Sequence, residues 1–96
     1  MDRIVIPPPA PRVWNLHHKP AAPSGAVYVG RGTAWGNPFI IGRHGTRPQV
    51  VRMHREWLCE QPELLARLPE LRGKHLLCHC APMLCHADTL MELANA

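Results

Sequence analysis

Short strand-like segments alternate with helical segments along this chain, and this alternation limits the possible fold more than any other feature of the sequence. Gly25 and Gly30 bound a run of residues that suit a pleated surface, at positions 26–29. A second apolar run, at positions 75–80, follows the helical segments and predicts a buried strand. Strands that alternate with helices are typical of α/β folds. We therefore expect a small α/β layer fold, in which a short, at least partly parallel sheet is flanked by helices.

Apolar residues recur at helical spacing in the stretches between and after these strands. Thr46 can cap a helix that runs to about Glu60, and Gln49 can complete a capping box. A shorter apolar stripe begins at Pro62, and Pro69 is expected to break or kink it. A third helix is expected at the C-terminus. The apolar positions of the first helix are assigned to the scaffold: Val50, Met53, Trp57 and Leu58.

The length of 96 residues is enough for a single domain with one modest core. Proline is concentrated before residue 25, so residues 1–24 are expected to form an extended arm with at most one short strand, over 12–16. Residues 25–96 are then the single α/β domain. Because no apolar run reaches the roughly 20 residues that span a bilayer, we expect a cytoplasmic protein with no membrane partner.

The formal net charge of +4 is unevenly distributed, since most Lys and Arg residues precede Glu56 and most acidic residues follow it. A positive half predicts an anionic partner, either a nucleotide-like small molecule or nucleic acid bound through the basic N-terminal half. A simple solvated face is the alternative. Nothing in the sequence indicates the oligomeric state.

A glycine-rich loop, Gly30 to Gly42, follows the first predicted strand. Its glycines let backbone amides approach a phosphate or ribose, and Arg31 adds a forked positive charge. The loop matches neither the dinucleotide-binding nor the P-loop motif. Trp35 could stack on a base or fill the core, and Phe39 is expected in the core. The candidate ligand-binding residues of this loop are Gly30, Arg31, Gly32, Trp35, Gly36 and Asn37.

A cysteine and histidine cluster follows the second predicted strand. Alternation along that strand places Cys78 and Cys80 on one face as further ligand-binding candidates, with His79 on the other. Cys85 and His86 open the C-terminal helix, where the positive end of the helix dipole is expected to lower the pKa of Cys85. Cys85 and His86 are therefore the candidate catalytic residues, as nucleophile and base, and His79 is an alternative base.

Two other interpretations of this cluster stay open. Cys78, Cys80, Cys85 and His86 could bind zinc, although all four lie in one strand-turn-helix unit instead of two separated pairs. Zinc is therefore the alternative and no cofactor is favoured. The cysteines could also simply pack in the core, as is expected of Cys59.

Both sets of candidate residues follow predicted strands. In α/β sheets, ligands bind beyond the carboxyl ends of the strands. We therefore expect Arg31 and His86 to face one shared cavity. The leading hypothesis is a domain that binds or processes a nucleotide or a nucleotide-like molecule, and the alternative is a non-enzymatic zinc module that contacts nucleic acid or protein. Whether the protein is an enzyme is left open.

The order and spacing of several motifs resemble a known family. These are the runs at 27–31 (VYVGR), 35–39 (WGNPF), 57–58 (WL), 71–74 (LRGK), 78–82 (CHCAP) and 85–88 (CHAD). From Val27 to Asn95 the chain resembles domain of unknown function family 4326, found in bacteria and their phages. This resemblance implies an intracellular protein and a fold, but no activity. The cysteine segment is also similar to the end of family 488, where Cys80 is unmatched, and this favours a pocket over a four-ligand zinc site.

Overall fold

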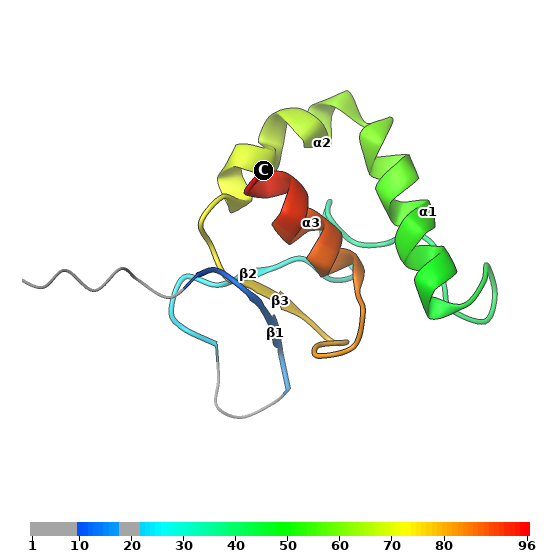
Figure 1. The fold of residues 1–96 in the computed structure, drawn as a ribbon, viewed down its shortest axis with the longest axis horizontal. Coiled ribbons are helices and arrows are strands. Elements are labelled where there is room, and N and C mark those ends of the chain that lie inside the picture. The colour runs from blue at the N-terminus through cyan, green and yellow to red at the C-terminus, as the bar shows by residue number, and fades with distance from the viewer. Residues whose placement is uncertain (1–9, 18–21) are drawn as a thin grey trace, which may run out of the picture.

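The structure is a computed structural model that describes residues 10–17 and 22–96. Figure 1 shows a small sheet with the helices gathered beside it. The elements follow one another as β1 (Val13–Asn15), β2 (Val27–Tyr28), α1 (Arg47–Cys59), α2 (Pro62–Arg67), a short 3₁₀ helix η1 (Leu68–Leu71), β3 (Leu76–Cys78) and α3 (His86–Ala94). The predicted small α/β fold is confirmed.

The sheet has three strands in the order β1-β3-β2, and both neighbouring pairs are parallel. Val13 and Val27 both pair with Leu76, so β3 lies between the other two strands in the same register. The sheet is therefore parallel throughout, and the carboxyl ends of its strands meet at one edge. Helix α3 packs against β1 and β3.

Strand β1 belongs to the sheet even though it lies in the segment expected to be an arm outside the α/β domain. The N–H of Leu16 donates to the Cys78 carbonyl at 2.8 Å, and the N–H of Leu76 donates to the Arg12 carbonyl at 3.1 Å. The indole N–H of Trp14 also donates to His75 Nδ1 at 3.0 Å. The sheet thus begins before residue 25, while residues 1–9 and 18–21 of the expected arm lie outside the described residues.

The first two helical segments follow their sequence signals. Thr46 is the N-cap of α1, and its N–H donates to the Gln49 side chain at 2.8 Å, as expected for a capping box. Helical geometry tightens from α2 into the 3₁₀ helix η1, which contains Pro69. Gly73 then adopts a positive φ of 73°, where a side chain would be strained, and the chain turns into β3.

The core lies between the sheet and the helices. Leu76 of β3, Leu58 of α1 and Leu90 of α3 are completely buried. Val29 follows β2 directly and is buried with them. Because Val29 and Leu76 are fixed in this core, the segments that follow β2 and β3 are held in place at one edge of the sheet.

Candidate functional site

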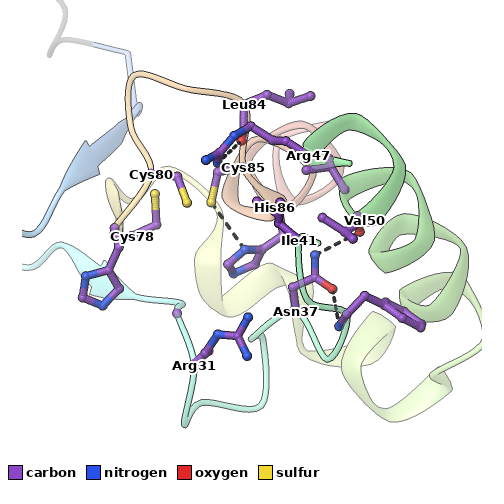
Figure 2. A pocket seen from close by; sticks show the side chains of 14 residues that line it. Arg31, Asn37, Ile41, Arg47, Val50, Cys78, Cys80, Leu84, Cys85 and His86 are labelled. Atoms are coloured by element: carbon purple, nitrogen blue, oxygen red, sulfur yellow. Dashed lines mark hydrogen bonds between the residues drawn. The ribbon is translucent and has the colours of Figure 1, made fainter. Parts of the chain in front are cut away.

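A cavity of about 180 Å³ lies beyond the carboxyl ends of β2 and β3. There the glycine-rich loop that follows β2 and the cysteine-containing segment that follows β3 meet the first turns of α1 and α3 (Figure 2). Figure 2 shows the three cysteine side chains gathered on one side, with Arg31 pointing toward His86 from the facing loop. The cavity is lined by Gly30, Arg31, Asn37, Phe39, Ile41, Arg47, Val50, Val51, Cys78, His79, Cys80, Leu84, Cys85 and His86.

The expectation that Arg31 and His86 face one cavity is confirmed. Residues more than 40 positions apart in the sequence are joined there because β2 and β3 are parallel neighbours. Seven of the ten candidate residues named from the sequence line the cavity: Gly30, Arg31, Asn37, Cys78, Cys80, Cys85 and His86.

The other three candidates, Gly32, Trp35 and Gly36, do not line it. Trp35 is 4% exposed and packs in the hydrophobic core, and its carbonyl faces His54 Nε2 at 3.1 Å. A Cβ at Gly36 would lie 2.9 Å from the Gly30 carbonyl oxygen, so this glycine permits a close approach within the loop. Residues 30–36 of the loop thus turn tightly on themselves, with Gly30 and Arg31 reaching the cavity from this part and Asn37, Phe39 and Ile41 reaching it from the part that follows.

Six of the fourteen lining residues were not candidates from the sequence: Phe39, Ile41, Arg47, Val50, Val51 and Leu84. Phe39, expected in the core, lines the cavity, and so does Val50, which was assigned to the scaffold. The Nη1 of Arg47 donates to the carbonyl of Leu84, another lining residue, at 3.2 Å. These contacts join segments remote in sequence, and neither helical periodicity nor a local motif signals them.

The loop after β3 is clamped by Asn15, the last residue of β1. The Asn15 amide nitrogen donates to the His79 carbonyl at 3.0 Å and to the Ala81 carbonyl at 2.9 Å. Strand β3 consequently ends at Cys78, earlier than the predicted end at Cys80, and Cys80 lies in the bend that follows. Alternation along the strand therefore does not set the direction of the Cys80 side chain.

The neighbouring groups act on the pKa of the Cys78 thiol. The Cys85 thiol is the largest influence, and the backbone N–H groups of Cys80 and Ala81 act in the same direction. Together they hold the pKa of the Cys78 thiol below its usual range, although burial acts in the opposite direction. Cys78 itself is 1% exposed.

Cys85 differs from the expectation based on its place at a helix N-terminus. Its hydrogen bond with Cys78 and its burial raise the pKa of the Cys85 thiol, and these effects outweigh the hydrogen bond from the Ala87 N–H. Cys85 is the N-cap of α3, and its own N–H donates to the Asp88 carboxylate at 2.9 Å. The sequence placed Cys85 at the start of this helix correctly but could not show that burial and Cys78 outweigh the effect of the helix terminus.

His86 is held between Cys85 and the end of β2. Its Nε2 lies 2.6 Å from the Val29 carbonyl oxygen, and its Nδ1 lies 3.4 Å from Cys85 Sγ. A carbonyl oxygen only accepts, so Nε2 carries the hydrogen and, in the neutral ring, Nδ1 is an acceptor. Burial, followed by the nearby charge of Arg31, lowers the pKa of His86.

His54 lies behind His86 and was not identified from the sequence. It is completely buried on α1, with its ring centroid 5.0 Å from that of His86. Burial first, and then the proximity of His86, lowers the pKa of His54 from 6.5 to about 4. Its Nδ1 has no hydrogen-bond partner within the described part of the chain.

His79, the alternative base, has both ring nitrogens engaged. Its Nδ1 lies 2.9 Å from His17 Nε2, and its Nε2 lies 2.9 Å from the Tyr28 hydroxyl. These contacts tie the ends of β2 and β3 together beside the cavity. His79 is therefore arranged to brace the wall, whereas His86 presents a nitrogen to a thiol.

The cavity wall carries positive charge. Arg31 and Arg47 line it, and none of the described lining residues is Asp or Glu. Two ion pairs occur among residues 10–17 and 22–96, Arg55 with Glu92 and Arg67 with Glu70, and neither includes a cavity arginine. This arrangement suits an anionic ligand.

Within residues 10–17 and 22–96, no group of three or more His, Cys, Asp or Glu side chains has a geometry that could hold a metal ion. No helix in these ranges is both long enough and apolar enough to cross a membrane.

Comparisons with known proteins identify the family. A family model described as "Domain of unknown function (DUF4326)" matches residues 14–96, so the match begins at Trp14 of β1, earlier than the Val27 expected from the motifs. The chain is 30% identical over 73 residues to the uncharacterised 12.4 kDa protein in the nrdA-td intergenic region of Enterobacteria phage T4, covering 72% of this chain and 67% of the phage protein. No solved structure matches it significantly. The chain therefore belongs to the domain of unknown function family DUF4326.

Proposed function

We propose that the chain binds an anionic, nucleotide-like small molecule in the cavity at the carboxyl ends of β2 and β3. One observation carries this proposal: two arginines, Arg31 and Arg47, face a cavity whose described lining contains no acidic residue. A bound phosphate or carboxylate would give these guanidinium groups the negatively charged partner that the described cavity lining does not provide. Guanidinium groups bind such anions in forked, two-point geometry.

The remainder of the wall suits the uncharged part of such a ligand. Val50 offers apolar surface opposite the cysteines, and Asn37 lies between Val50 and Arg31 (Figure 2). Phe39 adds apolar surface to the lining. The Asn37 amide nitrogen donates to the Val50 carbonyl at 2.9 Å, and its carbonyl accepts from the Phe39 N–H at 2.9 Å. Asn37 therefore shapes the wall more than it offers free polar groups.

The size of the cavity limits how much of the ligand it encloses. A volume of about 180 Å³ is smaller than the roughly 300–1,000 Å³ of pockets that enclose a drug-sized ligand. We expect the cavity to hold the phosphate and ribose end or the base, with the rest of the molecule lying across the exposed rim formed by Ile41 and Leu84. The thiols of the opposite wall need the reducing conditions of the cytoplasm, which is the location we propose.

The test is binding of a nucleotide panel to the purified, reduced protein, measured by calorimetry and by thermal shift. We expect at least one nucleotide to bind, and Arg31→Gln or Arg47→Gln to weaken it by about tenfold, since a hydrogen bond to a charged group contributes about 1.5–3 kcal/mol. Arg52→Gln is the matched control, because Arg52 is exposed on α1 outside the cavity. If no member of the panel binds, or if all three variants bind equally well, the proposal is wrong.

Measurements on the same purified protein distinguish the proposed function from two alternative functions. A zinc module predicts one equivalent of zinc in the purified protein, lost together with folding when Cys85 is replaced. A nucleic-acid-binding module predicts a salt-sensitive gel shift with RNA or DNA that free nucleotide does not compete away. Metal-free folded protein that binds free nucleotide favours the proposed function over both.

A further inference from the structure

Among residues 10–17 and 22–96, no helix covers the second face of the sheet. Helices α1, α2 and α3 lie on one side of the sheet (Figure 1). Leu76 and Cys78 of β3 point to that side, where both are buried in the core. Leu77 alternates with them and therefore points to the other side. Because parallel sheets are normally covered on both faces, the second face is expected to have a partner.

A row of three side chains crosses this second face. Trp14 of β1 and Tyr28 of β2 are both in register with Leu77, so the three side chains lie next to one another. All three are partly exposed, and none belongs to the hydrophobic core. Val13 and Val27, one position earlier on the same strands, pack against the core instead. The row therefore consists of two aromatic rings with Leu77 between them.

Further planar side chains lie against both rings of this row. The Arg12 guanidinium carbon lies 3.7 Å from the centre of the Trp14 ring, and the Trp14 indole N–H donates to His75 Nδ1 at 3.0 Å. The His79 ring meets the Tyr28 ring edge to face, with centres 5.6 Å apart. These contacts hold the rings in place. We call this surface the open face, and it consists of Arg12, Trp14, Tyr28, His75, Leu77 and His79.

The open face has a positive charge and no negative charge. None of its six residues is Asp or Glu, and Arg12 is exposed. Neither of the two ion pairs in the described part of the chain includes Arg12. Five of the six side chains are planar, and Leu77 is the single aliphatic one. Planar rings stack on nucleobases and guanidinium groups bind phosphate, so this composition suits a nucleic acid better than the aliphatic surface of a protein.

We infer that the open face binds single-stranded nucleic acid, with bases stacked on Trp14 and Tyr28 and a phosphate held by Arg12. Unpaired bases expose the flat surfaces that stacking needs, whereas a duplex hides them. This inference goes beyond the proposed function and does not depend on it. The cavity lies at the edge of the sheet, and of the six open-face residues only His79 lines it.

The experiment is fluorescence anisotropy of labelled oligouridylate and oligothymidylate, each about 10 nucleotides long, titrated with the reduced full chain. A duplex that contains the same thymidylate strand is the comparison. We expect at least one single strand to bind about tenfold more tightly than the duplex, and more weakly as salt increases. If neither single strand binds at low salt, or if the duplex binds equally well, the inference is wrong.

Variants of Trp14 separate stacking from general attraction. Trp14→Leu keeps an apolar side chain but removes the ring, so binding should weaken about tenfold, whereas Trp14→Phe should keep most of it. Trp57→Leu is the matched control, because Trp57 is another partly buried tryptophan and lies on α1, away from the open face. Equal binding by Trp14→Leu and the wild-type protein, in variants whose thermal unfolding shows that they fold, would overturn the inference.

A variant of Arg12 tests the phosphate contact. Arg12→Gln should lower the slope of log Kd against log salt concentration by about 0.7, the value for one phosphate contact on a single strand. Arg52→Gln, at an exposed position on α1, should leave the slope unchanged. An unchanged slope in Arg12→Gln would overturn the role of Arg12.

A competition assay distinguishes the open face from the cavity. Binding of the strand that survives both excess mononucleotide and Arg31→Gln supports the open face, whether or not a nucleotide occupies the cavity. If both abolish strand binding, the strand enters the cavity, and the open-face inference fails while the proposed function stands. A second copy of the chain is the other possible occupant. A dimer in sedimentation that Trp14→Leu separates, with no strand bound, would overturn the inference in favour of that copy.

Discussion

At the scale of single residues, the environment of each polar group decides its chemistry. Cys78 and Cys85 are the same residue type and line the same cavity, yet the pKa of one thiol is lowered and that of the other is raised. The sequence predicts the members of this cluster from their place at a strand end and a helix start. It could not predict the direction of either pKa shift, because burial and neighbouring groups are set only in the folded chain.

The buried pair of His54 and His86 makes stability depend on pH. The pKa of His54 is about 4 in the folded protein against 6.5 for an ordinary histidine, so the unfolded chain binds protons more readily. The resulting stability is fully present above about pH 6.5 and is lost as pH falls toward 4, with about 1.36 kcal/mol for each unit between the two pKa values. The lowered pKa of His86 acts in the same direction.

We predict that the urea midpoint falls steeply from pH 6.5 to pH 4 and that His54→Gln makes this fall shallower. His44→Gln is the control, because His44 is exposed in the loop before α1. If the urea midpoint of His54→Gln falls with pH as steeply as that of the wild-type protein, the buried imidazole does not account for the pH dependence.

Gly30 has a steric role at the edge of the cavity. A Cβ at this position would overlap the ring and hydroxyl of Tyr28. The hydroxyl lies at hydrogen-bond distance, 2.9 Å, from His79 Nε2 at the end of the neighbouring strand. Gly30→Ala should therefore destabilise the protein by about 1–3 kcal/mol, as overpacking does. In a Tyr28→Ala background the same change should cost little, and chemical denaturation of the four proteins in this cycle measures the difference. An equal cost in both backgrounds would place the strain elsewhere.

At the scale of elements, the sequence predicted the helix starts and breaks that depend on residues adjacent in the chain. The capping residues Thr46 and Gln49 give α1 its start, and Pro69 marks the change from α2 to η1. Strand β1 was expected only as a short strand in an arm, because proline-rich flanks conceal the non-local pairing that draws it into the sheet. Likewise, the end of β3 is set by Asn15 from another strand and not by its own apolar pattern.

The clamp formed by Asn15 predicts the behaviour of the loop after β3. Asn15→Ala removes both donors to the loop carbonyls, so we expect a loss of about 1–3 kcal/mol and faster amide hydrogen exchange over residues 79–84. Leu16→Ala, at the exposed neighbouring residue, is the control. Unchanged exchange over 79–84 in Asn15→Ala would show that the loop holds its shape without β1.

At the scale of the whole molecule, the parallel sheet creates the site by bringing two distant segments to one edge. The sequence allowed this meeting to be predicted, because ligands in α/β folds bind beyond strand ends. It did not reveal the opposite wall. Arg47, at the start of α1, and Phe39, in the loop before it, line the cavity because of tertiary contacts that no local sequence pattern indicates. Trp35 packs in the core for the same kind of reason.

The proposed binding of an anion in the cavity is tested most directly by amide chemical-shift mapping of the full chain during titration with the nucleotide panel. We predict shifts in two separate stretches, around Gly30–Arg31 and over residues 80–86, with the helical surface of Pro62–Arg67 unchanged and with the shifts weakened in Arg31→Gln. Shifts confined to one of the two stretches, or centred on a surface away from the ends of β2 and β3, would contradict a single ligand site built from both.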